Sequence, residues 1–427
     1  MTRSGIDHVA ISASAGSGKT FQLAHRYIRL MANGVSPDRI IALTFSRKAA
    51  GEIFDSVVKY LCDASASPEG ARGTGGLIGK IDFGQQDFLR LLRSLLVSIH
   101  SLHISTLDSF TVGILKSFPM ELGIPSGFQI MDSDSGDAKA ATRRVLSLIF
   151  NHRRVAGPAQ QAFLEAFRQA TFGQETKNLD MSLEGFISGF RERYCLMPEA
   201  EQWGEEATIW PEGSPWLKPA GDLAAAAADL KASLQASGFT DRMTEGLARI
   251  VDFCSGYGES SYWDDPLSKT VVFQSLLAGL EDLERGQMTL RYDRGEYPLT
   301  AAQCRLLFTL LRHVMGVELR AAVRRTRGLY QVLHQYEQFY DDMVRRRGQL
   351  TFTDAQYLLT AGNRDSSVSV LSRTPGQEAR LYIDYRLDCK LDHWLLDEFQ
   401  DTSDLQWEVL RNLADEILQD ISGQRSF

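Results

Sequence analysis

The amino-acid sequence lacks both a long apolar run and a recognisable cysteine pattern. No stretch approaches the ~20 apolar residues that a membrane-spanning helix needs, and the opening MTRSGIDHVAIS lacks the apolar core of a secretory signal. The 5 cysteines lie far apart without a C-x-x-C pair, which excludes a disulfide framework and a thiolate metal site. We therefore expect a cytoplasmic protein whose cysteines serve as small buried hydrophobic residues.

The sequence also has an excess of negative charge. It contains 46 basic and 54 acidic residues, which give a net charge of −8. This balance argues against an unaided, non-specific nucleic-acid binder, although it leaves room for a local basic groove. The 44% hydrophobic and 23% charged residues are ordinary for a folded protein and exclude a disordered chain. At about 100 to 200 residues per domain, the length of 427 residues predicts two or three structural units.

The first part of the chain alternates between strand and helix patterns. We predict strands at Asp7–Ile11 and Arg39–Phe45, and helices at Thr20–Met31 and Arg47–Leu61. Strands separated by helices of this length indicate right-handed crossovers and a parallel sheet. The fold class is therefore α/β.

The predicted secondary structure changes twice in the rest of the chain. A loop rich in small residues (Cys62–Gly79), a helix (Phe88–Ile99) and a third strand (Leu102–Leu107) precede long helical stretches such as Leu223–Leu234. After residue 349 strand patterns return at Leu381–Tyr385 and Trp394–Leu396. We expect a helical domain, residues 132–349, inserted into an α/β domain made of residues 1–131 and 350–427.

Ala13 to Thr20 reads Ala-Ser-Ala-Gly-Ser-Gly-Lys-Thr between a predicted strand and a predicted helix. Glycines let backbone N–H groups close around phosphate oxygens, and the N-terminus of the helix favours the negative charge. Lys19 would contact the β- and γ-phosphates of ATP, and the Thr20 hydroxyl would bind Mg²⁺. The alternative is a Gly/Ser turn with an incidental Lys-Thr. The expected ATP-binding residues are Ala13, Ser14, Ala15, Gly16, Ser17, Gly18, Lys19 and Thr20.

A second polar motif follows the predicted strand near residue 396, where Asp397 and Glu398 come in succession. Two carboxylates at the carboxyl edge of a parallel sheet lie where open α/β folds bind ligands. Asp397 can hold Mg²⁺, and Glu398 can orient or deprotonate the attacking water, a division of labour that phosphoryl transfer needs. The alternative is an acidic helix cap.

Four segments resemble, in the same order, motifs I, Ia, Ic and II of UvrD/Rep-type superfamily 1 helicases. They are Ala13–Thr20, Thr44–Ile53, Ile104–Phe110 and Asp397–Thr402. Within that group the sequence most resembles the N-terminal ATPase half of RecB and AddA subunits of helicase–nuclease complexes. The resemblance implies a RecA-like P-loop domain with a helical insertion, which uses ATP and Mg²⁺ to move 3′ to 5′ along single-stranded DNA in double-strand-break repair.

The resemblance also assigns roles to individual residues. Lys19, Asp397, Glu398 and Gln400 are the expected catalytic set, and Gln406 matches a trailing glutamine of motif II. Phe45 is a candidate for stacking on a DNA base, with core packing as the alternative. Asp108 stands where these helicases usually carry His. The expected DNA-binding residues are Thr44, Phe45, Lys48, Thr106, Asp108, Ser109 and Phe110.

The chain also departs from the family pattern. Phe21, which we count among the ATP-binding residues, occupies a place where these helicases often have Arg, and no room exists before Val9 for their adenine-reading glutamine. The sequence ends at Phe427, just where motif III is expected. We therefore expect part of a longer helicase, inactive by itself, whose parent acts on single-stranded and duplex-end DNA together with a partner subunit.

One stretch of the helical block is basic. Residues 300–348 contain 9 Arg and 4 acidic residues, and Arg320, Arg324 and Arg327 share a helical face. We interpret it as a solvated face beside a core aromatic stripe rather than as a DNA surface. The main alternative function is a P-loop module that binds nucleotide or DNA without hydrolysis. A GTPase is disfavoured because the sequence has no Asn-Lys-x-Asp segment.

Overall fold

The computed structural model describes residues 6–11, 18–151, 157–170, 179–214, 216, 221–258, 266–360, 391–418 and 424–427. The chain forms two compact units. Unit 1 comprises residues 1–153, 178–198 and 336–427, and unit 2 comprises residues 154–177 and 199–335. Unit 2 lies within the segment 132–349 that the sequence predicts to be inserted, and it is narrower than that segment.

Unit 1 contains both predicted halves of the α/β domain. Its elements, in chain order, are α1 (Lys19–Ala32), η1 (Pro37–Arg39), β1 (Ile40–Thr44), α2 (Arg47–Ala66), α3 (Pro68–Ile78), α4 (Gln85–Val97), η2 (Ile99–Ser101), β2 (His103–Thr106), α5 (Leu107–Ser117), β3 (Gln129–Met131), α6 (Gly136–Asn151), α8 (Leu179–Leu196), the end of α14 (Ala301–Met343), η6 (Arg345–Arg347), β6 (Gln349–Thr351), α15 (Phe352–Leu359), β7 (His393–Leu396), η7 (Phe399–Asp401) and α17 (Asp404–Leu418).

The sheet of unit 1 is parallel, as the sequence predicts. The described strands run in the order β2-β1-β7, and Ala42 lies opposite Ile104 on one side and Leu395 on the other. Alternate residues of β1 enter two different cores, because Ile41 packs with α5, α15 and α17 while Ala42 packs with α1, α2 and α4. A strand buried on both faces is typical of a parallel sheet covered by helices. This arrangement aligns the carboxyl ends of β1, β2 and β7 at one edge.

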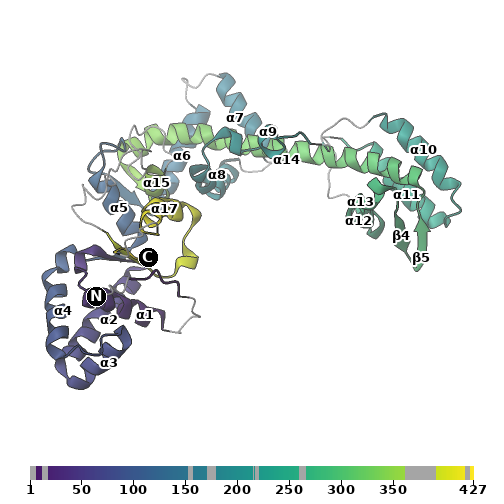
Figure 1. Cartoon of the computed structure of the whole chain (residues 1–427). Coiled ribbons are helices and arrows are strands. Elements are labelled where there is room, and N and C mark those ends of the chain that lie inside the picture. The colour runs from purple at the N-terminus through teal and green to yellow at the C-terminus, as the bar shows by residue number, and fades with distance from the viewer. Residues whose placement is uncertain are drawn as a thin grey trace. The chain divides into compact units, whose positions relative to one another are not determined.

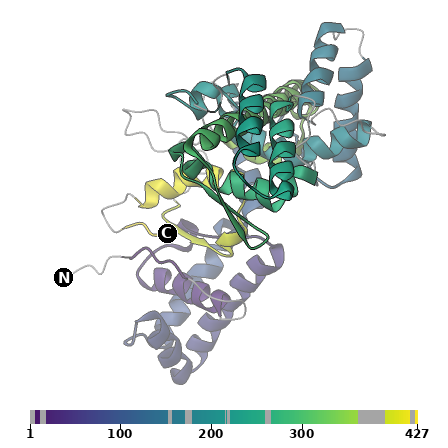
Figure 2. The same ribbon diagram turned by 90° about the vertical axis from the view of Figure 1, so that its right-hand side faces the viewer.

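The first four helices form one group in both views (purple in Figure 1 and Figure 2). The predicted loop at residues 62–79 is wrong, because α2 continues to Ala66 and α3 follows at once. Ser67 caps α3 by accepting a hydrogen bond from Gly70 N, and Pro68 occupies its first turn. A Cβ at Gly70 would lie 2.2 Å from the carbonyl oxygen of Asp63, so the small residues permit close helix packing.

Two other strand predictions have different outcomes. Residues 6–11 are described but do not form a strand: Val9 N donates to the carbonyl of Phe427 at 3.0 Å, and Val9 and Ile11 remain 47% and 52% exposed among the described residues. The predicted strand Leu381–Tyr385 lies outside the described residues. Among the helices that the structure describes, none is long and apolar enough to cross a membrane.

A buried charge cluster joins α8, the end of α14, η6 and α15 in unit 1. It consists of Arg191, Glu337, Arg345 and Asp354, whose side chains are 12%, 6%, 3% and 0% exposed. Asp354 Oδ1 accepts from both arginines, and Oδ2 accepts from Thr351 N at 2.7 Å. Two cations and two anions balance the charge, which allows the group to remain buried.

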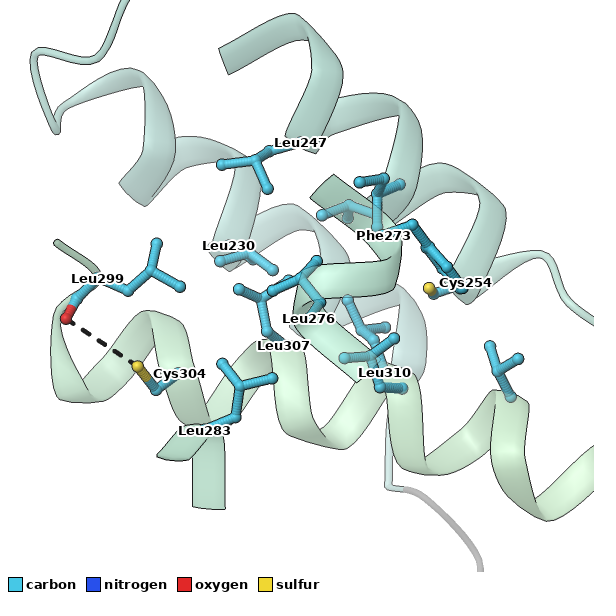
Figure 3. Packing of buried hydrophobic residues seen from close by; sticks show 14 of the residues in the cluster. Leu230, Leu247, Cys254, Phe273, Leu276, Leu283, Leu299, Cys304, Leu307 and Leu310 are labelled. Atoms are coloured by element: carbon cyan, nitrogen blue, oxygen red, sulfur yellow. Dashed lines mark hydrogen bonds between the residues drawn. The ribbon is translucent and has the colours of Figure 1, made fainter. Parts of the chain in front are cut away.

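Unit 2 is mainly helical and has its own core (Figure 3). Leu230, Leu247, Phe273 and Leu307 meet there, and the side chain of Cys304 faces the carbonyl of Leu299 (Figure 3). Its elements are α7 (Gly157–Ala170), η3 (Ala200–Gln202), α9 (Glu206–Ile209), α10 (Leu223–Gln235), α11 (Asp241–Ser255), η5 (Pro266–Lys269), α12 (Val271–Ala278), α13 (Leu280–Arg285), the antiparallel hairpin β4 (Thr289–Tyr292) and β5 (Gly295–Pro298), and most of α14.

The arginine-rich part of α14 is partly engaged within the protein. Arg327 donates to the carbonyl of Gly204 at 2.9 Å, and Arg325 donates to the carbonyl of Ala170 at 3.1 Å. Of the aromatic residues around the end of this stretch, Tyr336 and Tyr340 are 0% and 1% exposed and lie in the core, while Tyr330 and Phe339 are only partly buried. The predicted aromatic core is therefore confirmed for two of its four rings, and at least two arginines bind backbone carbonyls of unit 2.

Candidate functional site

The phosphate-loop motif leads directly into α1. Gly18 has a φ of +86°, a left-handed conformation that glycine adopts without strain, and Lys19 and Thr20 begin the helix. Phe21 follows in the same first turn. The preceding predicted ATP-binding residues lie outside the described part of the chain; they are Ala13, Ser14, Ala15, Gly16 and Ser17.

The acidic pair follows β7 at the carboxyl edge of the sheet. Asp397 N donates to the carbonyl of Leu43 at 2.9 Å, which extends the β7–β1 pairing by one bond. Glu398 adopts a φ of +53°, a left-handed conformation that is uncommon for a residue with a side chain. Such backbone strain persists where the surrounding structure fixes it and is concentrated at functional sites. The two carboxylates have different partners, since Asp397 Oδ1 accepts from Glu398 N at 3.1 Å while Glu398 Oε2 accepts from Lys19.

The fold brings the two motifs into contact across 379 positions of sequence. Lys19 Nζ donates to Glu398 Oε2 at 2.6 Å, and the two side chains are 24% and 33% exposed. Gln400 Nε2 donates to the same carboxylate oxygen. Three of the four residues predicted to be catalytic therefore meet through direct hydrogen bonds, and the fourth, Asp397, is adjacent in the chain.

The charges at this contact influence one another. The hydrogen bond with Glu398 raises the pKa of Lys19, and the bonds from Lys19 and Gln400 lower the pKa of Glu398. Burial and the negative charge of Glu398 raise the pKa of Asp397. Lys19 thus favours a negative partner, while Asp397 lies where added positive charge would stabilise its ionised form.

The available donors suit Mg²⁺. The hydroxyl of Thr20 and the carboxylate of Asp397 are hard oxygen ligands of the kind that Mg²⁺ accepts, usually together with phosphate oxygens and water. In the part of the chain that the structure describes, no group of three His, Cys, Asp or Glu residues forms a self-sufficient metal site. A site of two protein ligands completed by substrate phosphates fits this donor set.

An aromatic group not anticipated from the sequence adjoins the start of α1. The rings of Phe21 and His25 are 4.0 Å apart between centroids, and Tyr60 of α2 lies 4.5 Å from His25. His25 Nδ1 donates to the carbonyl of Phe21 at 2.7 Å, whereas its Nε2 is buried without a hydrogen-bond partner among the described residues. The helical spacing of Phe21 and His25 was visible in the sequence, but Tyr60 is brought in only by the packing of α2.

A groove with a volume of about 500 Å³ opens beside the same edge of the sheet. The N-termini of α2 and α5 border it, and Ser46 and Thr106 cap these helices by accepting bonds at 3.1 Å from Ala49 N and Ser109 N. We call it the α2–α5 groove. Its lining residues are Arg47, Ala50, Gly51, Phe54, Ile99, Leu102, Ile104, Ser105, Thr106 and Ser109.

The residues predicted to bind DNA have different surroundings. Thr106 and Ser109 line the α2–α5 groove, and Lys48 is exposed at the start of α2. Phe45 is half-buried and packs against the core. Thr44 is 1% exposed, so its side chain offers DNA no surface in this conformation.

Phe110 and Asp108 are engaged within the protein. Phe110 is 8% exposed and its ring meets that of Trp394 edge-on at 5.5 Å, which places it in the core. Asp108 Oδ1 accepts hydrogen bonds from Gln356 and Gln406, both at 3.4 Å. Gln356 lies 248 positions from Asp108, and no local pattern in the sequence indicates this partner.

Comparisons with known proteins show the family to which the chain is similar. The sequence profile described as UvrD/REP helicase N-terminal domain matches residues 2–246. An ATP-dependent helicase/nuclease subunit of Streptococcus sanguinis (strain SK36) is 29% identical over 210 residues, covering 48% of this chain and 15% of that protein. The protein of the same name from Streptococcus suis (strain 98HAH33) is 24% identical over 300 residues, covering 67% of this chain and 21% of that protein.

The matched segments thus span about a fifth or less of the length of these relatives. The profile match covers more than half of the chain and includes the phosphate-loop motif, β1 and β2. Such a match implies a RecA-like P-loop fold, which the parallel sheet and its covering helices support. The chain belongs to the family of UvrD/REP helicase N-terminal domains.

Proposed function

We propose that this chain supplies the ATP-binding portion of an ATP-dependent DNA helicase of the RecB/AddA type, which moves 3′ to 5′ on single-stranded DNA during double-strand-break repair. The contact between Lys19 and Glu398 carries the proposal, because it joins the phosphate-loop lysine to the carboxylate expected to act on water. The two relatives are named as subunits, which supports a partner subunit for the protein that carries this chain.

The residues divide the chemistry between binding and proton transfer. A triphosphate that enters the site takes Lys19 away from Glu398, because phosphate oxygens offer the ammonium group a stronger set of acceptors. Glu398 is then free to accept a proton from the attacking water, while Gln400 holds its carboxylate in place. Thr20 and Asp397 would hold Mg²⁺, which neutralises charge on the phosphate oxygens when bound.

The α2–α5 groove is the proposed track for single-stranded DNA. Arg47 and the N-termini of α2 and α5 supply positive charge and backbone N–H groups for phosphates. Phe54, Ile99 and Ile104 supply an apolar wall for bases. A local basic edge with apolar walls suits sequence-independent binding even in a chain of net charge −8.

Removal of the Arg47 side chain tests the groove. The logarithm of the affinity falls as the logarithm of the salt concentration rises. The steepness of this fall decreases by about 0.7 for each phosphate of single-stranded DNA that the protein no longer neutralises. We therefore expect Arg47→Ala to reduce the salt slope of oligo(dT) binding by about this amount, measured by fluorescence anisotropy between low and moderate salt. Arg72→Ala, which changes an exposed arginine of α3, is the matched control and should leave the slope unchanged. Equal slopes for Arg47→Ala and the unaltered chain would contradict the proposal that single-stranded DNA binds in this groove.

Phe45→Ala tests base stacking. If the exposed part of the ring stacks on a base, the substitution weakens oligo(dT) binding by about 1 to 3 kcal/mol. The measurement is the same anisotropy titration, accompanied by thermal unfolding, and Phe186→Ala on α8 is a control for loss of a half-buried aromatic ring. Unchanged DNA affinity together with a lowered melting temperature would assign Phe45 to core packing alone.

ATP hydrolysis tests the proposed function as a whole. In the protein that carries this chain, we expect single-stranded DNA to stimulate hydrolysis and Lys19→Ala to abolish the stimulated rate. The alternative is a module that binds nucleotide or DNA without hydrolysis. Nucleotide binding that depends on Lys19, without any turnover in a single-turnover assay of the DNA-bound protein, would favour that module.

A further inference from the structure

Asp108 occupies an unusual place for an acidic residue next to a proposed DNA track. It lies in the first turn of α5, beside Thr106 and Ser109, which line the α2–α5 groove. A carboxylate repels DNA phosphates, so direct backbone contact is a poor use of this side chain. Its Oδ1 instead accepts from two glutamine side chains of other helices, Gln356 of α15 and Gln406 of α17, both at 3.4 Å. Bonds of this length are weak individually, but an ionised acceptor strengthens them.

The orientation of Gln406 is fixed from its other side. Its Oε1 accepts from Ser403 N at 3.1 Å, and Gln406 N donates to Ser403 Oγ at 3.3 Å. These reciprocal bonds form a capping box at the start of α17. The side-chain amide must therefore present its NH₂ group to Asp108, because the oxygen is already committed to a backbone donor.

The segment before Ser403 leads straight back to the nucleotide site. Asp401 N donates to the carbonyl of Glu398 at 2.9 Å, which closes the short helix η7. The ring of Phe399 packs edge-on against Trp407 at 5.2 Å between centroids. Hydrogen bonds and ring packing thus make residues 398–407 a compact unit, with Glu398 at the lysine contact and Gln406 at Asp108.

Asp108 and its second partner, Gln356, also lie on helices that pack against the core. Leu107 and Phe110, close to Asp108 in the first turn of α5, are 4% and 8% exposed, so this turn packs against the core. Gln356 is 7% exposed and lies two residues after Asp354 of the buried charge cluster, which fixes α15. A shift of the segment 398–407 would therefore change the hydrogen bond between Gln406 and Asp108, which lies beside the groove-lining residues Thr106 and Ser109.

We propose that Asp108 is a positioning residue that couples the nucleotide site to the DNA groove, by holding Gln406 of the segment that follows Glu398 against the N-terminus of α5. The inference rests on the proposed function and adds a residue through which its two ligands influence one another. When nucleotide draws Lys19 away from Glu398, the segment 398–407 shifts, and the Gln406–Asp108 bond transmits the change to α5. Partial burial raises the pKa of the Asp108 carboxyl, and the two glutamine bonds oppose that rise.

The test is the linkage between two equilibrium binding reactions of this chain. The affinity for fluorescein-labelled oligo(dT) is measured with and without saturating Mg²⁺ and a non-hydrolysable ATP analogue, and the ratio of the two dissociation constants is the coupling. Coupling between sites commonly amounts to about fivefold or more. We expect such a ratio for the unaltered chain and a ratio near one for Asp108→Ala.

Four further variants make the outcome specific. Asp108→Asn keeps an acceptor oxygen for Gln406 and should retain most of the coupling. Gln406→Ala should lose it, and the double variant Asp108→Ala with Gln406→Ala should lose no more than either single one, since both act through one bond. Asp137→Ala removes an exposed acidic residue from the first turn of α6 and controls for the loss of a favourable helix-end charge.

Other results overturn the proposal. A ratio of one in the unaltered chain, with both ligands bound, rejects the coupling while leaving the proposed function intact. Intact coupling in Asp108→Ala with weaker DNA binding makes Asp108 a direct DNA contact. Loss of both affinities together with a lowered melting temperature makes it a structural residue only. Failure of the unaltered chain to bind either ligand rejects the proposed function itself.

Discussion

Glu398→Gln is expected to abolish ATP hydrolysis by the protein that carries this chain while tightening its hold on nucleotide. In the structure the Lys19 ammonium group donates a hydrogen bond to Glu398 Oε2 at 2.6 Å. This bond competes with the phosphate that we expect Lys19 to bind. A neutral amide competes less well for Lys19, so the dissociation constant for Mg²⁺-ATP should fall. The same change removes the proposed general base, and loss of such a base commonly lowers the rate by about 10² to 10⁴.

Lys19→Ala should behave in the opposite way. It removes the cation that we propose to contact phosphate in the ground state as well as in the transition state, so binding and hydrolysis should both fall. Fluorescent nucleotide titrations and steady-state hydrolysis with single-stranded DNA separate the two effects, and Asp404→Asn in the first turn of α17 controls for a change of charge nearby. If both variants lose nucleotide affinity equally, the assigned roles of Lys19 and Glu398 are wrong.

Asp354→Asn should cause the largest loss of stability in unit 1. Its carboxylate accepts from Arg191 and Arg345 and also from Thr351 and Tyr340, and its side chain is 0% exposed. Breaking a buried ion pair by removing one partner costs about 3 to 5 kcal/mol, because the remaining charges stay buried without compensation. We expect this loss in the free energy of unfolding, measured by urea denaturation followed by circular dichroism.

A surface ion pair supplies the control for that experiment. Arg143 and Glu184 form a bidentate pair whose arginine is 65% exposed, and Glu184→Gln should change the free energy of unfolding far less, since solvent screens such pairs. Similar losses for Asp354→Asn and Glu184→Gln would show that the buried charge cluster contributes little to stability.

The pH dependence of stability gives a second view of Asp354. Burial by itself raises the pKa of this carboxyl, but Arg191, Arg345 and the bonds from Thr351 hold the pKa well below its usual range. As the pH falls, the Asp354 carboxyl is therefore protonated in the unfolded chain before it is protonated in the folded chain. Its contribution to the free energy of unfolding is complete above the ordinary pKa of about 3.9 and is lost as the pH falls below that value. Between about pH 5 and pH 3, the unaltered chain should lose more unfolding free energy than Asp354→Asn.

The local elements of unit 1 could largely be predicted from the sequence. Regular apolar spacing predicted α1 and α2, and the apolar run before Phe45 predicted β1. The helix α3 was missed because its sequence PEGARGTGGLI contains four glycines, which disfavour a helix on intrinsic grounds. Tertiary packing overrides that preference, since a Cβ at Gly70 or Gly75 would lie within 3 Å of a backbone carbonyl oxygen.

The candidate site was predictable where one local motif carries the chemistry. Each motif was predicted to follow a strand, and the acidic pair was expected at the carboxyl edge of a parallel sheet, where such folds bind ligands. Residues 6–11 do not form the strand predicted before Lys19, yet Lys19 and Glu398 meet at 2.6 Å. Asp108 was not predictable in the same way, because its partners Gln356 and Gln406 lie 248 and 298 positions away. Only the packing of α5, α15 and α17 shows that this half-buried carboxylate accepts hydrogen bonds from two glutamines.

The most direct test of the account is a calorimetric titration of this chain with Mg²⁺-ATP. We predict saturable binding at one site in the unaltered chain and in Lys48→Ala, which changes an exposed lysine that contacts only Glu52 among the ion pairs that the structure describes. Lys19→Ala should bind at least about tenfold more weakly, because a charged hydrogen bond to phosphate is removed. Equal affinity in Lys19→Ala and the unaltered chain would show that Lys19 does not bind phosphate and would contradict the nucleotide site proposed around its contact with Glu398.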